Sequence, residues 1–246
     1  MSRRKMIVGN WKMNLPADPA AAVDVLAGAV VSKTTGDAAV IICPPTTMIA
    51  SLAGRGIRVG GQDCHVAKAG PHTGEISAEM LAAAGATHVI IGHSERRATH
   101  SETDEIVAKK AKAAWRAALT AIVCVGESQV QRDGGAAYSA VATQLVGSIP
   151  KGAKASNTVI AYEPIWAAGS AKAVSADDIE NMHAAIRTEV GRRFGDGVAA
   201  NTRILYAGPM DQDNAAEILS MEDVDGAMIG DASIKPSTLF AIANMS

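Results

Sequence analysis

Eight short apolar runs are spaced along the whole chain, and each is too short to form a helix. They are MIVG from Met6, AAVIIC from Ala38, IRVGG from Ile57, HVIIG from His88, AIVCVG from Ala121, TVIAY from Thr158, RILYAG from Arg203 and DGAMIG from Asp225. Most are rich in β-branched residues, which is typical of strands that are buried on both faces of a parallel sheet. The runs therefore predict eight buried strands.

Amphipathic patterns occupy intervals between these runs. Ser175 is placed to cap a helix whose first turn holds Asp177 and Asp178. Its apolar stripe consists of Ile179, Met182, His183, Ile186 and Val190. A second helix is predicted to begin near Ser101, because acidic residues come early and basic residues late, an order that complements the helix dipole. These residues are Glu102, Asp104 and Glu105, then Lys109, Lys110, Lys112 and Arg116.

Alternating strands and helices predict an α/β fold with parallel strands joined by crossovers. Eight such units in one domain of 246 residues favour a closed barrel with an outer ring of helices. The alternative is an open, doubly wound sheet. Two features disfavour it: no GxGxxG follows the first strand, and polar residues cluster directly after the apolar runs, where a barrel carries its active site.

Composition and charge narrow the class of protein. Hydrophobic residues make up 48% of the chain but aromatic residues only 3%, which suits an interior of small branched side chains. The net charge of −2 and the lack of a long Lys/Arg run argue against a nucleic-acid partner. A small anionic ligand stays possible because its site needs only a few donors.

Membrane insertion and export are not expected. The apolar run after the basic start MSRRK is far shorter than a signal-peptide core, and no stretch approaches the roughly 18 apolar residues of a membrane span. The three cysteines, Cys43, Cys64 and Cys124, are odd in number and lack metal-ligand spacing. Reduced thiols in the cytoplasm are therefore the expectation, with no bound metal.

Polar side chains follow three of the predicted strands. Strand one is followed by Asn10 and Lys12, strand four by His93, and strand six by Glu163. Because the carboxyl ends of the strands meet at one mouth of a barrel, an amide, an ammonium, an imidazole and a carboxylate converge there. Each alone could be an ordinary solvated or satisfied residue, but their shared position indicates a catalytic site.

Four motifs then carry a resemblance. GNWKMN at 9–14, GHSERR at 92–97, CVGE at 124–127 and AYEPIWA at 161–167 resemble the triosephosphate isomerase family, in order and across nearly the whole chain. The resemblance implies a single TIM-barrel domain over 1–246. It also implies an aldose–ketose isomerase that interconverts dihydroxyacetone phosphate and D-glyceraldehyde 3-phosphate through an enediolate, in glycolysis and gluconeogenesis, without a cofactor.

By this resemblance Glu163 is the base that removes and returns the substrate proton, and the apolar Ile165 and Trp166 would disfavour its charged form. His93 would remain neutral, as the imidazole in the active site of this family is well known to be, because a helix beginning at Ser94 points its positive end at the ring. Lys12 would supply positive charge to the enediolate and the phosphate. Asn10, Ser94 and Glu95 would orient these groups.

The resemblance also implies a lid that closes over the site, since an exposed enediol phosphate can eliminate its phosphate. One hinge would be Pro164, Ile165 and Trp166, and the other Lys172, Ala173 and Val174. The segment 167–171 between them would be the moving tip, and its small residues suit a segment that bends.

The phosphate site departs from the family pattern. By resemblance it comprises Gly169, Ser170, Gly208, Gly230 and Asp231, but the family's serine is Pro209 here and Asp231 replaces a glycine. Proline lacks an N–H, and losing a hydrogen bond to a charged group costs on the order of 1.5–3 kcal/mol. Three interpretations stay open: a somewhat weakened triosephosphate isomerase, an isomerase with an altered substrate, or a barrel that acts as a binding or scaffold protein.

The segment 63–77 is predicted to be a long, polar loop after strand three. By resemblance it inserts into a second copy of the chain, with Thr73 reaching the neighbour's site, so the chain would be a homodimer. A mobile surface loop is the alternative.

Overall fold

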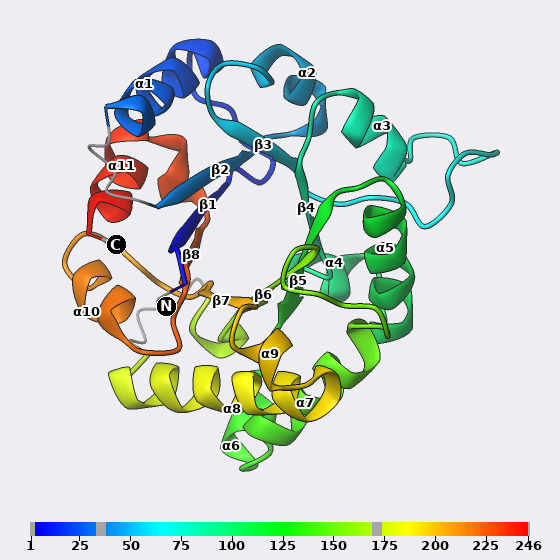
Figure 1. Ribbon diagram of the computed structural model, residues 1–246, viewed down its shortest axis with the longest axis vertical. Helices are drawn as coiled ribbons and strands as arrows, with labels where there is room; N and C mark the ends of the chain where they lie inside the picture. The colour runs from blue at the N-terminus through cyan, green and yellow to red at the C-terminus, as the bar shows by residue number, and fades with distance from the viewer. Residues whose placement is uncertain (1–2, 33–37, 169–173, 246) are drawn as a thin grey trace.

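The computed structural model describes residues 3–32, 38–168 and 174–245. Its strands form a closed barrel in sequence order, and each strand is parallel to its neighbours (Figure 1). They are β1 Met6–Asn10, β2 Ala39–Cys43, β3 Arg58–Gly61, β4 His88–Ile91, β5 Thr120–Val125, β6 Thr158–Tyr162, β7 Arg203–Tyr206 and β8 Gly226–Ile229. The predicted barrel is confirmed, and the open-sheet alternative is wrong because β8 pairs with β1.

Helices surround this ring of strands (Figure 1). They are α1 Pro19–Val31, α2 Ile49–Leu52, α3 Ala78–Ala83, α4 Ser94–Thr99, α5 Asp104–Arg116, α6 Gln129–Asp133, α7 Ala137–Ser148, α8 Ala176–Phe194, α9 Asp196–Ala199, α10 Ala215–Ser220 and α11 Pro236–Asn244, with 3₁₀ turns η1 Thr46–Met48, η2 Ile165–Ala167 and η3 Asp231–Ile234. Within the described residues, none of the helices has the length and apolar character needed to cross a bilayer.

Both helices predicted from the sequence are present, as α8 and α5. In α8, the Ser175 side chain accepts a hydrogen bond from the Asp178 backbone N–H, and the predicted apolar stripe is buried, so this prediction is confirmed. The helix predicted to begin near Ser101 is α5, and its first residue is Asp104. The cap of α5 is Thr103, whose hydroxyl accepts from Ile106 N, whereas Ser101 lies outside the helix with φ 54°.

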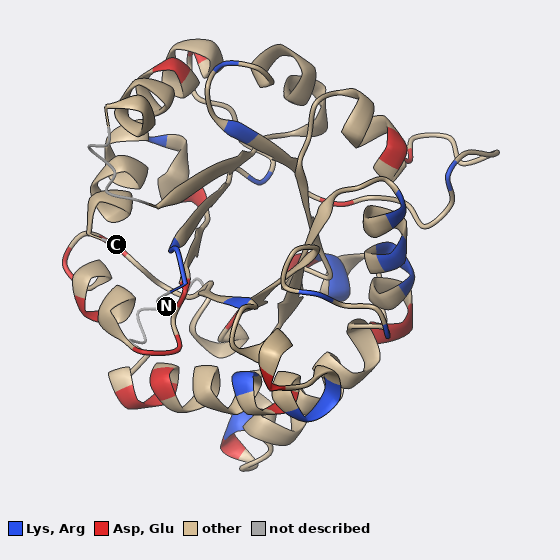
Figure 2. Cartoon of the chain, in the orientation of Figure 1, with Lys and Arg blue, Asp and Glu red and all other residues tan. Residues whose placement is uncertain are grey.

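Two apolar layers follow from the alternation of side chains along each strand. One set of side chains fills the barrel, including Val8, Ile90, Ile122 and Leu205. The other set packs between the strands and the helices, including Ile7, Val89 and Val123. Charged residues lie mainly on the outer helices and the loops (Figure 2). The polar side chains at the strand ends are therefore exceptions in a largely apolar centre.

Candidate active site

A cavity of about 330 Å³ opens at the carboxyl ends of the strands. Asn10 is the last residue of β1, Lys12 follows it by two positions, His93 follows β4, and Glu163 comes directly after β6. All four side chains line this cavity. The convergence expected from the strand ends is thus present in the fold.

The carboxylate of Glu163 is held by three donors. Its Oε2 accepts from the Ser94 backbone N–H at 2.9 Å, and its Oε1 accepts from the Ser94 hydroxyl at 3.1 Å. His93 Nε2 lies 2.9 Å from the same Oε1. Glu163 is only 7% exposed, so these contacts stabilise a carboxylate that water hardly reaches.

The proton on His93 is assigned by its second nitrogen. His93 caps α4, and its Nδ1 accepts from the Glu95 backbone N–H at 3.2 Å, so the neutral ring carries its proton on Nε2, facing Glu163. Burial lowers the pKa of His93, but the hydrogen bond to Glu163 and the charges of Glu163 and Glu95 outweigh it and leave the pKa raised. The helix end expected to keep the ring neutral is present, yet the neighbouring carboxylates act in the opposite direction.

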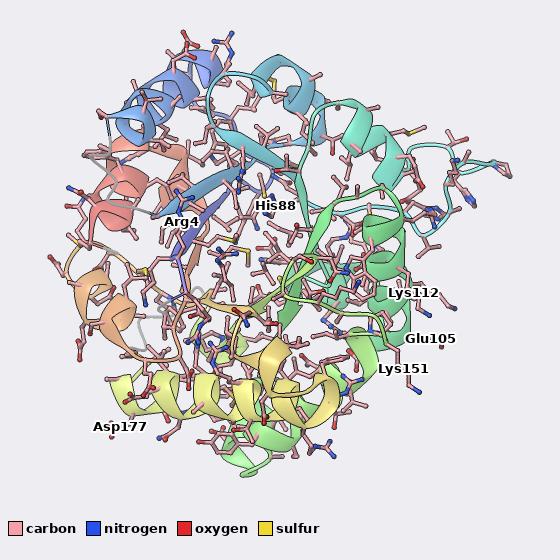
Figure 3. The ribbon with its side chains drawn as sticks, in the orientation of Figure 1. Arg4, His88, Glu105, Lys112, Lys151 and Asp177 are labelled. Carbon is pink, nitrogen blue, oxygen red and sulfur yellow. The ribbon has the colours of Figure 1, made fainter. Side chains whose placement is uncertain are left out.

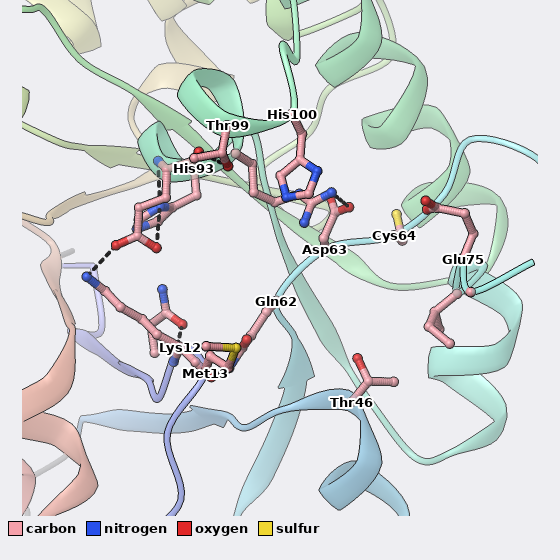
Figure 4. Close-up of a pocket in the computed structure, with 15 residues that line it drawn as sticks. Lys12, Met13, Thr46, Gln62, Asp63, Cys64, Glu75, His93, Thr99 and His100 are labelled. Atoms are coloured by element: carbon pink, nitrogen blue, oxygen red, sulfur yellow. Dashed lines mark hydrogen bonds and ion pairs between the residues drawn. The ribbon is translucent and has the colours of Figure 1, made fainter.

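Lys12 is positioned by contacts on three sides. Its Nζ donates to Glu95 Oε1 at 2.7 Å, its backbone N–H donates to Asn10 Oδ1 at 3.1 Å, and its carbonyl accepts from Gln62 Nε2 at 2.8 Å (Figure 4). Its φ of 52° is uncommon for a residue with a side chain, and such strain is frequent at functional sites. Sequence reasoning missed Gln62, although its place directly after β3 was a usable signal.

The charge of Lys12 is maintained in this setting. Burial lowers the pKa of Lys12, but the hydrogen bond to Glu95 and the charges of Glu95, Asp231 and Glu163 outweigh burial and raise it. Burial raises the pKa of Glu95, whereas Lys12 and His93 lower it more, so the pKa lies below its ordinary value. An ammonium and an ionised carboxylate therefore face each other beside the cavity.

Within 3–32, 38–168 and 174–245, no group of three or more His, Cys, Asp or Glu side chains could hold a metal ion. The arrangement instead offers a base, a hydrogen-bond donor and a cation around one small cavity. Such a set can move a proton on a carbon beside a carbonyl group.

Comparison with known proteins agrees with this chemistry. Residues 5–246 match the sequence profile of the family described as triosephosphate isomerase. The chain belongs to the triosephosphate isomerase family. Curated relatives with that name include proteins from Bradyrhizobium sp. (strain ORS 278), 49% identical over 98% of this chain and 97% of the relative, and from Xanthobacter flavus, 51% identical over 98% and 97%. A crystal structure of triosephosphate isomerase from Bartonella henselae is similar with a TM-score of 0.91 at 41% identity, covering 98% of both chains.

A buried carboxylate anchors the segment that the resemblance to triosephosphate isomerases marks as the first lid hinge. Glu127 Oε1 accepts from Trp166 Nε1 at 2.8 Å, from the Tyr162 hydroxyl at 3.1 Å and from Arg132 at 3.2 Å. The Arg132 guanidinium also lies 4.2 Å from the centre of the Trp166 ring. No role was assigned to Glu127 or Arg132 from sequence, because their partners come from other strands and helices.

Gly126 explains how the base comes so close to β5. A Cβ atom at this position would lie 1.7 Å from the carbonyl oxygen of Glu163, so only glycine permits this approach. The CVGE motif shared with triosephosphate isomerases therefore has a structural reason at its glycine. It brings the backbone of Glu163 against the end of the neighbouring strand.

The phosphate side of the cavity differs from the sequence expectation at one residue. Gly208, Pro209 and Gly230 line the cavity, but Asp231 does not. The Asp231 carboxylate is exposed and accepts from Asn14 Nδ2 at 3.3 Å. Asp231, the change from the family pattern that opposes phosphate binding most strongly, thus has its side chain outside the cavity.

The remaining lid and phosphate predictions fall partly outside the described residues. Gly169, Ser170, Lys172 and Ala173 are not among the residues that the structure describes. Pro164 directly precedes η2, Ile165 and Trp166 lie within it, and Val174 packs against the core.

A second cavity of about 510 Å³ lies beside the first and shares Lys12 and His93 with it (Figure 4). Its wall includes Met13, which is 95% exposed. The loop 63–77 projects away from the barrel between β3 and α3 (Figure 1), and Thr73 within it is exposed. Residues 74–76, which directly follow Thr73, line this second cavity, whereas Thr73 itself does not.

Replacing Glu163 by Gln should lower the pKa of His93, because it removes the charge and hydrogen bond that raise it and leaves burial in place. An NMR pH titration of the imidazole nitrogens measures this. Glu95→Gln is the matched control and should lower the pKa less, since Glu95 Oε2 lies 3.7 Å from Nδ1 and its side chain is 56% exposed. A His93 pKa that stays constant or rises in Glu163→Gln contradicts this account.

Proposed function

We propose that Glu163, His93 and Lys12 carry out the isomerisation of triose phosphates in this chain. The family membership assigns the reaction, the interconversion of dihydroxyacetone phosphate and D-glyceraldehyde 3-phosphate. The residue roles rest on one observation above all: the Glu163 carboxylate and the His93 Nε2–H meet at 2.9 Å on the wall of a cavity that the Lys12 ammonium also lines. A base and two electrophilic groups thus face the same small volume.

Glu163 acts first as the base. It takes a proton from the carbon beside the substrate carbonyl, and the electron pair of that C–H bond moves to form the enediolate. The protonated carboxyl then returns the proton to the neighbouring carbon while the hydroxyl proton passes from one enediolate oxygen to the other, so one carboxylate serves both carbon proton transfers. Hydrogen bonds from Ser94 occupy both oxygens of the Glu163 carboxylate, so at least one of these hydrogen bonds must break before the carboxylate can accept the substrate proton.

His93 and Lys12 stabilise the negative charge that develops on oxygen. The Nε2–H of His93 points into the site because Nδ1 is occupied by the Glu95 backbone N–H. Lys12 contributes a positive charge near both the enediolate and the phosphate. Donors placed in advance at a water-poor site stabilise a developing oxyanion more than they would in water.

Closure of the segment after Trp166 completes the proposal. The bond between Trp166 and the buried Glu127 gives this end of the segment a fixed anchor. Covering the cavity would keep water away from the enediolate and prevent phosphate elimination. Gly169 and Ser170 would then reach the phosphate together with Gly208 and Gly230.

Glu163→Gln should lower kcat/KM for glyceraldehyde 3-phosphate by at least about a thousandfold, because the amide cannot accept the proton. Glu163→Asp keeps the carboxylate but moves it by one methylene, and should lose about a hundredfold. Glu180→Gln, at an exposed position of α8, is the matched control and should retain full activity. Turnover near the unsubstituted level in folded Glu163→Gln would overturn the assignment of the base.

A phosphate-bearing substrate is supported by the position of Asp231. Its carboxylate bonds Asn14 and is exposed, so solvent and salt screen its repulsion of a bound phosphate. The backbone N–H groups at the start of η3 remain available, since a helix cannot pair its own first donors. This favours triose phosphate over an altered substrate or a barrel kept only for binding.

Asp231→Gly and Asp231→Asn should each lower KM for the triose phosphate by up to about tenfold, with little change in kcat, because both remove a screened negative charge. Steady-state kinetics at low and high salt provide the test, and the gain should shrink at high salt. A fall in KM of a hundredfold or more would mean that the carboxylate faces the phosphate directly.

A homodimer is the second part of the proposal. The loop 63–77 is ordered by a His65 N–H to Ile76 carbonyl bond of 2.7 Å and by the His65 and His72 rings, whose centres lie 4.1 Å apart. In a symmetric pair, the exposed part of this loop would enter the open 510 Å³ cavity beside Lys12 of the other copy and cover its Met13 wall. The loop of one copy would thus complete the site of the other.

Sedimentation equilibrium at micromolar concentration should give twice the chain mass. Thr73→Arg should shift the mass toward one chain and lower activity, because a charged, longer side chain cannot enter the covered cavity. Thr188→Arg is the matched control, since Thr188 is exposed on the outer face of α8. A single-chain mass for the unsubstituted protein would refute the dimer.

We also place the protein in a reducing compartment, the cytoplasm. Cys43, Cys64 and Cys124 are all free and buried. Burial raises the pKa of Cys43 to about 12, so its thiol is seldom ionised and reacts slowly. Thiols kept in this state suit the cytoplasm.

A further inference from the structure

The opposite mouth of the barrel, at the amino ends of the strands, has an interior layer of polar and basic residues. Ile90, Ile122 and Leu205 belong to the apolar cluster that fills the barrel. Two residues earlier on the same strands stand His88, Thr120 and Arg203, and alternate residues of a strand face the same side. These side chains therefore point into the barrel, and His88 is seen inside the ring of strands (Figure 3).

A cavity of about 330 Å³ opens at this mouth. Its lining includes Arg58, His88, Thr120, Ser156 and Arg203. It shares none of its lining residues with the cavity of the proposed active site. The two cavities lie at opposite ends of the same strands.

The charges around this cavity are unbalanced. Among the described residues that line it, none is acidic. Asp225 is the acidic residue whose charge raises the pKa of Arg203. Its carboxylate oxygens already accept hydrogen bonds from Arg3, from Arg187 Nη2 at 2.6 Å and from the Ile204 backbone N–H at 2.8 Å. The exposed Arg58 and the half-buried Arg203 thus line one cavity without a carboxylate in its wall.

The pKa of His88 is affected by these unbalanced charges. Burial, followed by the charges of Arg58 on β3 and Arg203 on β7, lowers the pKa of His88 to about 4. Burial lowers the pKa of Arg203 as well, and Arg4 and Arg58 lower it further, although Asp225 acts against them. Such a cluster of cations is costly while empty, and an anion that enters it relieves the cost.

The hydrogen bonds of His88 leave one nitrogen for a ligand. The Thr87 hydroxyl donates to the Val59 carbonyl at 3.2 Å, so its oxygen accepts from His88 Nδ1, 2.8 Å away. In the described part of the chain no group bonds Nε2. The Nε atom of Arg203 donates to the Arg4 carbonyl at 2.8 Å, which orients its guanidinium.

We propose that this amino-terminal cavity binds a doubly charged phosphate group, held by Arg58, Arg203 and a protonated His88, with the hydroxyls of Thr120 and Ser156 beside it. Guanidinium groups match the geometry of phosphate oxygens and bond them in pairs. A dianion balances two arginines, and the third positive charge on His88 then appears only when the ligand is present. A single carboxylate would leave most of this charge uncompensated.

A cavity of about 330 Å³ has room for inorganic phosphate or a small phosphate monoester. Both present the same dianionic group to the arginines and differ only in the tail. The site is separate from the proposed active site, since it shares no lining residue with the cavity that Glu163 and His93 line. Its occupancy can therefore be measured apart from catalysis.

The test uses NMR of the histidine side chains in the whole protein during titration with inorganic phosphate. The chain has six histidines, and His88→Gln identifies the His88 resonances by their loss. Those resonances should shift in a saturable way with phosphate, separately from the His93 resonances that report the active site. Glycerol 2-phosphate, titrated in the same way, distinguishes the two sources: tighter binding identifies a monoester and equal binding identifies phosphate itself.

Arg58→Ala should weaken the binding reported by His88 by about tenfold to a hundredfold, the effect of losing a charge-assisted hydrogen bond. It should leave phosphate inhibition of the isomerase unchanged. Arg55→Ala is the matched control, because Arg55 is an exposed arginine nearby in sequence that pairs with Asp24 at 2.9 Å and does not line the cavity. The control should bind phosphate as tightly as the unsubstituted chain.

Sulfate, which stays doubly charged from neutral to mildly acidic pH, tests the role of His88. Its affinity should rise as the pH falls, because the bound anion raises the pKa of His88 and binding takes up a proton. The proposal is overturned if phosphate causes no saturable shift of His88, if Arg58→Ala and Arg55→Ala bind alike, or if sulfate affinity is independent of pH.

Discussion

Closure of the parallel ladder is the constraint on which the rest of this structure depends. β1 pairs with β2 on one side and β8 on the other, so Met6 stands opposite both Ala39 and Gly226. A Cβ atom at Gly226 would lie 1.9 Å from the Met6 carbonyl oxygen, and its φ of 143° is itself one that other residues rarely adopt. The last strand can therefore close the ring only through a glycine. Once the ring is closed, all eight strands end at the same rim.

At the carboxyl ends of the strands, the charged and polar side chains are already paired without a ligand: Lys12 with Glu95, and His93 with Glu163. Glu95 has a side chain that is 56% exposed, so its ion pair with Lys12 contributes only about 0.2–1 kcal/mol and yields readily to a substrate anion. The contact between His93 and Glu163 is different, because both side chains are almost fully buried. Breaking it without replacement would leave a buried carboxylate with fewer donors, which is costly. The substrate must therefore take the place of those donors as it binds.

The two ends of the barrel differ in how they treat charge. At the carboxyl end, Lys12 has an acidic partner in Glu95 of α4. At the amino end, Arg58 and Arg203 face a cavity whose described lining holds no acidic side chain, and His88 loses its proton more easily as a result. The same alternation of side chains along the strands produces both arrangements. It directs the residue at each end of a strand either into the barrel or toward the helices.

The sequence by itself determined the barrel, the order of its strands and the rim position of Asn10, Lys12, His93 and Glu163. These follow from patterns that repeat within a few residues: buried runs of β-branched side chains, helix caps such as Ser175, and the rule that parallel strands end together. The tertiary structure alone decided which atoms meet. The Gln62 amide bonds the Lys12 carbonyl, the Trp166 indole bonds Glu127, and the Asp231 carboxylate bonds Asn14. The tertiary structure also starts α5 at Asp104, a few residues after Ser101. Local periodicity encodes burial, whereas a side-chain rotamer and its partner depend on groups that lie tens or hundreds of residues away in the chain, and those become neighbours only when the ring closes.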